Sequence, residues 1–268
     1  MAHTVNPAAD AILDKEYKVL DHGFIRLVDF LGGDERIIQA ARVSYGKGTK
    51  TFREDQKLIQ FLLKNEHTSP FEQVVFTFHV KMPLFVARQW VRHRTARINE
   101  ISGRYSEMID EFYTPETDQI NYQNTLNKQG RSEEIVPLDL AKRVISSLET
   151  SYKDSFEKYD SLIKDNISRE IARINLPLSL YTQMYWQIDL RNLMNFLKLR
   201  MDAHAQWEIR EYAKVLADIV KIVTPVAFEA FDEYELNSKT LSRSQVDELR
   251  IALRESNPEI LKKLGIAL

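Results

Sequence analysis

The 268-residue chain is predicted to fold as one α+β domain over residues 1–268. Three observations predict this class. Strand-like segments gather in the first third, whereas helical periodicity dominates the second half. Neither the polar stretch near the middle nor the charged tail separates two apolar cores. Finally, Gly46-Lys47-Gly48 has too few glycines for a dinucleotide-binding loop and follows a predicted helix, so a Rossmann fold is not implied.

The first third is predicted to contain two short strands, two helices, a buried strand and a third helix. These segments cover residues 17–21, 24–30, 34–48, 53–63, 71–81 and 83–90. The turn-like Asp21-His22-Gly23 separates the two strands. Asp34 caps the first helix, and Gly46-Lys47-Gly48 closes it. Residues 71–81 are apolar on both faces, which indicates a buried strand, and Pro83 fits the first turn of the following helix.

Helices are predicted to dominate the remainder. Residues 116–134 are polar, rich in Asn, Gln and Thr, and almost without periodicity, so we expect a surface loop or lid there, ending at Pro137. Two helical patterns follow, over 138–163 and 168–174. A long helix is expected over 190–223, stopped by Pro225. The charged tail, residues 237–268, is expected to add a peripheral helix.

Composition excludes several classes of protein. Hydrophobic residues make up 44% and charged residues 28%, as in ordinary globular proteins. No apolar run approaches the ~18 residues of a membrane span, and no signal peptide is visible. We therefore expect a cytoplasmic protein with no membrane partner. The chain has no cysteine, which excludes disulfides, thiolate metal ligands and a cysteine nucleophile.

The strongest functional signal is a cationic segment at residues 92–105. It places four arginines and one histidine around a single carboxylate, in a chain whose net charge is −2. Such fixed charge needs an anion, and the planar guanidinium suits phosphate. The segment also carries Asn99, Glu100, Ser102 and Tyr105, which are hydrogen-bonding groups of mixed sign. Together they suggest that a whole nucleotide is bound, base as well as phosphate.

Other interpretations of these residues remain open. The basic run can be a solvated helix face or a nucleic-acid patch, although an isoelectric point of about 6.3 argues against the patch. Polymer binding would fall steeply with salt. Further along, Arg200 and His204 are spaced to share one helix face. The alternative there is a surface face on which these residues form salt bridges with Glu208.

The chain resembles the flavin-dependent thymidylate synthases. Arg92-His93-Arg94, followed after seven residues by Ser102, is similar to that family's signature. Three more blocks match in the family's order, at residues 67–72, 85–90 and 193–208. The resemblance covers about residues 23–234. It implies an antiparallel sheet with flanking helices and a long C-terminal helix.

The resemblance also implies an activity. The protein would be a methyltransferase of dTMP biosynthesis that reductively methylates dUMP to dTMP, a route that needs no thiolate. Methylenetetrahydrofolate would supply the carbon, and FAD reduced by NADPH would supply the hydride. The implied partners are dUMP and further copies of the chain, in a homotetramer with shared active sites. Two alternatives stay open, a non-catalytic nucleotide- or RNA-binding protein and a flavoprotein reductase that does not methylate.

Site residues are implied by matching this chain to the family. Arg200 is the implied catalytic residue, because an arginine beside the pyrimidine would stabilise negative charge as C5 becomes nucleophilic. The implied flavin contacts are Ser69, Arg92, His93, Arg94, Glu100, Asp189, Leu190, Arg191, Asn195 and His204. The implied nucleotide contacts are Gln89, Trp90, Val91, Arg92, Glu100, Ile101, Ser102, Gly103, Arg104, Arg173 and Arg200.

Two residues depart from the family's pattern. Arg97 stands where a serine is frequent, and Asp189 where an asparagine is frequent, which replaces a donor-acceptor by an acceptor. Ser102 has no evident general base, so we expect it to hydrogen-bond the substrate and not to attack it. No metal is expected, and a site built from His67, Glu72 and His79 is an alternative that we do not favour.

Overall fold

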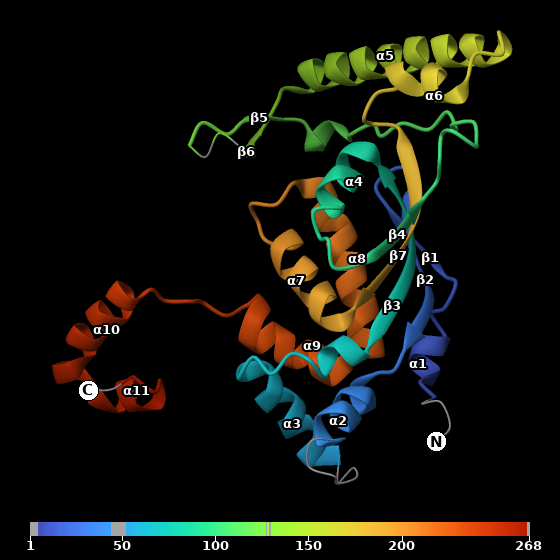
Figure 1. The fold of residues 1–268 in the computed structure, drawn as a ribbon. Coiled ribbons are helices and arrows are strands. Elements are labelled where there is room, and N and C mark those ends of the chain that lie inside the picture. The colour runs from blue at the N-terminus through green and yellow to red at the C-terminus, as the bar shows by residue number, and fades with distance from the viewer. Residues whose placement is uncertain (1–4, 44–51, 127, 129, 267–268) are drawn as a thin grey trace.

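The computed structural model describes residues 5–43, 52–126, 128 and 130–266. Its centre is a five-stranded sheet of order β1-β2-β3-β7-β4, in which every neighbouring pair is antiparallel (Figure 1). The strands are β1 (Glu16–Val19), β2 (Gly23–Leu31), β3 (Val75–Pro83), β4 (Arg97–Glu100) and β7 (Tyr181–Asp189). The predicted α+β class with an antiparallel sheet is confirmed. Gly46-Lys47-Gly48, predicted to close a helix, lies outside the described residues.

The sheet has one buried and one partly open face. Along β3, Phe76, Phe78 and Val80 are fully buried, whereas the residues between them are half-buried. The prediction of a strand over 71–81 that is buried on both faces is therefore wrong in two respects. Its first residues form a short 3₁₀ helix, η1 (Phe71–Gln73), and only alternate side chains enter the core, as strand geometry requires.

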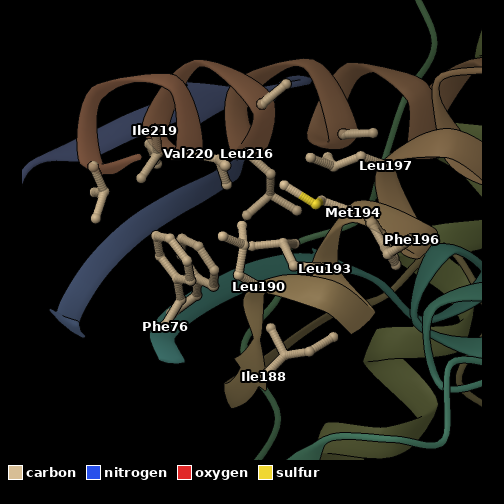
Figure 2. Packing of buried hydrophobic residues seen from close by; sticks show 14 of the residues in the cluster. Phe76, Ile188, Leu190, Leu193, Met194, Phe196, Leu197, Leu216, Ile219 and Val220 are labelled. Carbon is tan, nitrogen blue, oxygen red and sulfur yellow. The ribbon is translucent and has the colours of Figure 1, made fainter. Parts of the chain in front are cut away.

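Two helices cover the buried face, α7 (Leu190–Arg200) and α8 (Trp207–Val223). Figure 2 shows their apolar side chains meeting those of the sheet; the labelled residues are Phe76, Ile188, Leu190, Leu193, Met194, Phe196, Leu197, Leu216, Ile219 and Val220. The single long helix predicted over 190–223 is wrong. The helical path breaks after Arg200, where the Asp202 side chain accepts a hydrogen bond from the backbone N–H of His204 at 2.8 Å. Such local side-chain bonds compete with helical ones.

Beyond one end of the strands, at the top of Figure 1, lie α5 (Leu138–Lys164) and α6 (Arg169–Ala172). The 3₁₀ helix η3 (Arg173–Asn175) follows α6 directly. The stretch predicted as a loop over 116–134 is instead largely structured. It holds the 3₁₀ helix η2 (Thr117–Gln119), then a hairpin of β5 (Asn121–Gln123) and β6 (Arg131–Ile135). Below, we call residues 121–135 the β5–β6 hairpin. Its polar sequence hid the strands because neither strand enters a core.

The remaining helices lie around this frame. They are α1 (Pro7–Asp10), α2 (Asp34–Val43), α3 (Phe52–Lys64), α4 (Leu84–Trp90), α9 (Pro225–Phe231), the π-helix η4 (Asp232–Leu236), α10 (Arg243–Ser256) and α11 (Pro258–Lys263). The tail thus forms two helices where one was expected, and they extend away from the sheet (Figure 1). Among the described helices, none is long and apolar enough to cross a membrane.

Candidate active site

A pocket of about 270 Å³ opens where the segment after α4 meets the end of α7. Its lining is Arg92, His93, Arg94, Thr95, Ile188, Asn192, Asn195, Leu199 and Arg200. The structure therefore brings together five residues that the sequence assigned to one site. A larger hollow of about 550 Å³ lies between α5 and α6, but aliphatic side chains dominate it and it contains no predicted site residue.

Arg200 lines this pocket and is half-buried. Its Nε donates to Nε2 of His93 at 3.0 Å, and its Nη2 donates to the backbone carbonyl of Gln89 at 3.0 Å. That carbonyl lies in the last turn of α4, where helical acceptors lack an internal partner. Among the described residues, no carboxylate pairs with Arg200. Burial lowers the pKa of Arg200, yet a guanidinium stays charged. Its charge is thus available to an anion.

His93 contributes hydrogen-bonding geometry to the pocket and no charge. A guanidinium can only donate, so Nε2 of His93 accepts and the ring proton lies on Nδ1. Burial, and then the charge of Arg200, lower the pKa of His93 to about 4. The imidazole is therefore neutral near pH 7. Its ring packs edge-on against Phe196, with 4.7 Å between the centroids.

The mouth of the pocket carries donors that nothing in the described chain satisfies. Arg92 and Arg94 are exposed, and neither makes a hydrogen bond or ion pair with another described residue. The side-chain amide of Asn195 is also exposed and makes no hydrogen bond with another described residue. Two uncompensated guanidinium groups beside a neutral amide fit a ligand that carries phosphate groups. This donor set therefore fits the diphosphate of a flavin dinucleotide.

The second half of the signature, residues 100–104, belongs to a second group of polar side chains. This group lies around the end of β4 and around α6. Glu100 accepts a hydrogen bond from Thr182 at 2.6 Å, and the backbone N–H of Ile101 donates to the carbonyl of Gln183 at 2.9 Å. Gly103 is buried against Arg173, where an added Cβ would lie 3.0 Å from Cδ of the arginine. The structure thus places Arg173 beside the signature, and its expected contact with the nucleotide stays a prediction.

Arg104 and Ser102 belong to this second group. The Nε of Arg104 lies 3.0 Å from Oε2 of Glu170 on α6, an exposed pair that contributes little to stability. Ser102 accepts a hydrogen bond from the backbone N–H of Arg104 at 3.3 Å. No base among the described residues hydrogen-bonds the Ser102 hydroxyl, so the geometry gives it no activated nucleophile.

Several predicted site residues have structural roles in this chain. Asp189 caps α7 by accepting from the backbone N–H of Asn192 at 2.9 Å, and an aspartate does this as well as an asparagine. Arg191 pairs with Glu235. Leu190 and Trp90 have fully buried side chains in the core.

The other assignments lie at the surface. Ser69 precedes η1 and is exposed, and Val91 is partly exposed after α4. Arg97, which departs from the family's pattern and was not assigned to the site, is also exposed and donates to Gln187 at 3.2 Å. The expected helical pairing of Arg200 with His204 is wrong, because α7 ends at Arg200. His204 is largely exposed and pairs with Asp202 at 2.8 Å.

The sequence patterns did not reveal a partly buried chain of polar side chains that connects Gln89, a partner of Arg200, to Glu208. The Gln89 side chain donates to Gln206, and Gln206 donates to Oε2 of Glu208 at 2.8 Å. The alternative of Glu208 as a surface salt-bridge residue is contradicted, since only 1% of it is exposed. One signal was present in the sequence. Glu208 occupies the same four-residue spacing as Tyr212 and Leu216 of the apolar face of α8.

The described residues hold no cluster of three or more metal-ligating carboxylates and histidines. The groups that the structure gathers at the pocket are suited to binding an anion. Free guanidinium groups, a half-buried arginine and a neutral histidine surround one pocket on an α+β frame. The fold and the pocket therefore define a protein with a binding site for a phosphate-bearing ligand.

Comparison with known proteins gives the family. The Thy1 family, described as thymidylate synthase complementing protein, matches residues 26–226. A flavin-dependent thymidylate synthase from Treponema denticola is 60% identical over 238 residues, which cover 89% of this chain and 90% of the relative. One from Treponema pallidum is 53% identical over 253 residues, which cover 94% and 83%.

A solved structure agrees. The UMP/dUMP methylase PolB from Streptomyces cacaoi, bound with 5-Br dUMP, is 31% identical with a TM-score of 0.74, and the match covers 83% of this chain and 100% of that one. The chain belongs to the flavin-dependent thymidylate synthase family, and it is a methyltransferase.

Proposed function

We propose that the protein converts dUMP to dTMP at the pocket that contains Arg200, with FAD as its flavin. The observation that carries this proposal is the state of Arg200. It is half-buried, charged and held by two hydrogen bonds, yet no carboxylate among the described residues neutralises it. Relatives named for dUMP methylation and flavin dependence support the choice of substrate and cofactor.

FAD would be held by the donors at the mouth of the pocket. Arg92 and Arg94 suit its diphosphate, and Asn195 and the Nδ1–H of His93 suit polar edges of the ring. When bound, FAD reduced by NADPH would supply the hydride that accompanies the one-carbon unit from methylenetetrahydrofolate. The protein's own part is to bind, orient and polarise.

Arg200 would polarise the pyrimidine. The Nη1 of Arg200 makes no hydrogen bond within the described chain, so the guanidinium retains donors for the ring edge. Negative charge on that edge would accompany the activation of C5 as a nucleophile, and a fixed cation stabilises it without reorganising. His93 supports this role, because a neutral ring neither repels the guanidinium nor competes for the anion.

The dUMP phosphate and sugar would contact the second group, Glu100 to Arg104 with Arg173. Within one chain this group and the pocket are separate, since none of these residues lines the pocket. We therefore also propose a homotetramer in which different subunits complete one site. Mixing inactive Arg200→Ala with inactive Arg173→Ala chains under subunit exchange would then restore part of the activity. Mixtures that stay inactive despite exchange would contradict shared sites.

The main test uses purified protein with FAD, NADPH, methylenetetrahydrofolate and dUMP. We expect flavin absorbance that NADPH bleaches, and dTMP as product. Arg92→Ala with Arg94→Ala should weaken FAD binding by roughly tenfold or more, since a hydrogen bond to a charged group contributes about 1.5–3 kcal/mol. The matched control is Lys142→Ala with Arg143→Ala, two exposed neighbours on α5. A colourless protein that takes up no added FAD would contradict the proposal.

A further inference from the structure

A polar chain that the proposed chemistry does not use ends on a buried carboxylate in the first turn of α8. Glu208 receives contacts from three side chains. The Tyr113 hydroxyl donates to Oε1 at 3.1 Å, Arg131 pairs with the same oxygen, and Nε2 of Gln206 donates to Oε2 at 2.8 Å. A carboxylate at this depth is tolerated only where such donors replace water.

The other end of the chain reaches Arg200. Gln206 is an amide with one donor end and one acceptor end. Since an ionised Glu208 only accepts, Nε2 of Gln206 must face it, and Oε1 is left to hold the side chain of Gln89. The backbone carbonyl of Gln89 in turn accepts from Arg200 at 3.0 Å. The carboxylate thus fixes the orientation of the amide that holds the Gln89 side chain, and the backbone carbonyl of the same Gln89 contacts Arg200.

The carboxylate also anchors the β5–β6 hairpin. Arg131, the first residue of β6, pairs with Glu208 and donates from Nη1 to the carbonyl of Gln119 at 3.1 Å. Its guanidinium carbon lies 6.0 Å from the centre of the Trp207 ring, within range of a cation–π contact. Burial, and then the charge of Glu208, raise the pKa of Tyr113, which keeps that hydroxyl a donor.

We propose that Glu208 is a positioning residue for the reaction. Through Gln206 and Gln89 it fixes the direction of the Arg200 guanidinium, and through Arg131 it couples the β5–β6 hairpin to the pocket. The inference rests on the proposed function in so far as Arg200 acts on the substrate. Its contacts are those of the chain itself, so the coupling can also be measured without substrate or flavin.

A double-mutant cycle tests the catalytic consequence. Glu208→Gln keeps the size of the side chain and removes its charge. We expect turnover at saturating dUMP to fall about tenfold to a hundredfold, as misplacement of a catalytic group does. In an Arg200→Ala background the same change should cost less than about twofold, because its effect passes through Arg200. Equal losses in both backgrounds would overturn the proposal.

A matched control separates positioning from the loss of a buried ion pair. Arg42 and Asp55 pair between α2 and α3 with 10% and 14% of their side chains exposed, away from the pocket. Asp55→Asn should leave turnover unchanged in the folded protein. If Glu208→Gln does not fold, Gln206→Ala is the second variant to test. In this variant the Glu208 carboxylate keeps its ion pair with Arg131 and its hydrogen bond from Tyr113. Gln206→Ala should reproduce the loss of turnover, and full activity in this variant would overturn the proposal.

The substrate-free measurement is the titration of His93 by NMR. Its pKa is lowered partly by the charge of Arg200, whose Nε lies 3.0 Å from the ring nitrogen. If Glu208→Gln releases Arg200, the pKa of His93 should rise, and amides of the β5–β6 hairpin should exchange faster. Asp55→Asn should change neither. Unchanged titration and exchange in Glu208→Gln would overturn the proposal, whether or not the protein proves to methylate dUMP.

Discussion

Replacing Arg200 by alanine is the most direct perturbation of the site. The change removes a half-buried cation, its donation to His93 and its donation to the carbonyl of Gln89. Neither former partner is a charged group, so no buried carboxylate is left unpaired and the fold should survive. The pocket, however, loses its preorganised donor to developing negative charge. Removing one such donor costs about 10²–10³ in rate, or about 2.7–4 kcal/mol of transition-state stabilisation.

The assay is dTMP formation at saturating dUMP, with FAD occupancy and oligomer size measured on the same samples. We expect a large loss of turnover with flavin content almost unchanged, because Arg92 and Arg94 keep the pocket mouth cationic. Arg200→Lys should restore little, since an ammonium cannot hold both contacts in one plane. Lys198→Ala, an exposed change on the same helix, is the control. Near-normal turnover in Arg200→Ala would refute this role.

Two further predictions concern the same signature. Ser102→Ala should weaken dUMP binding modestly and keep measurable turnover, since a neutral hydrogen bond contributes about 0.5–1.5 kcal/mol. Complete inactivity of a folded, flavin-loaded variant would instead indicate that Ser102 is a nucleophile. For His93, the folded pKa of about 4 lies below the ordinary value of 6.5, so the unfolded chain takes up this proton first. Stability should therefore fall as the pH drops from about 6.5 to 4. His93→Gln should show a smaller fall in melting temperature, and an identical pH profile would contradict the assignment.

The sequence predicted the fold class because β2, β3, α2 and α5 have clear local patterns. It did not predict β7, the strand that lies between β3 and β4 in the sheet. The alternation was present, with Met184 and Trp186 buried and Tyr185 exposed between them. Its partners, however, lie about a hundred positions earlier in the chain, at registers such as Phe78 with Trp186. Local periodicity cannot indicate such pairing, because it depends on contacts formed only in the folded chain.

The break between α7 and α8 had a similar cause. Apolar spacing continues at helical period on both sides of residues 201–206, so the pattern predicted one helix. A single side chain, that of Asp202, provides the competing hydrogen bond. This error propagated into the site, because helical continuity placed Arg200, His204 and Glu208 on roughly the same side of one helix. In the structure they occupy three environments, which are a pocket, the solvent and the core.

Glu208 shows which part of a site a sequence can reveal. A carboxylate on the apolar face of α8, four residues before Tyr212, cannot remain charged there without donors. The sequence therefore indicates that a buried partner exists. It does not indicate that the partner is Arg131, because the chain has 37 basic residues and the pairing depends on the β5–β6 hairpin folding over α8. A charge that must be satisfied from a distant element makes that element part of the site, even when its own sequence reads as a polar loop.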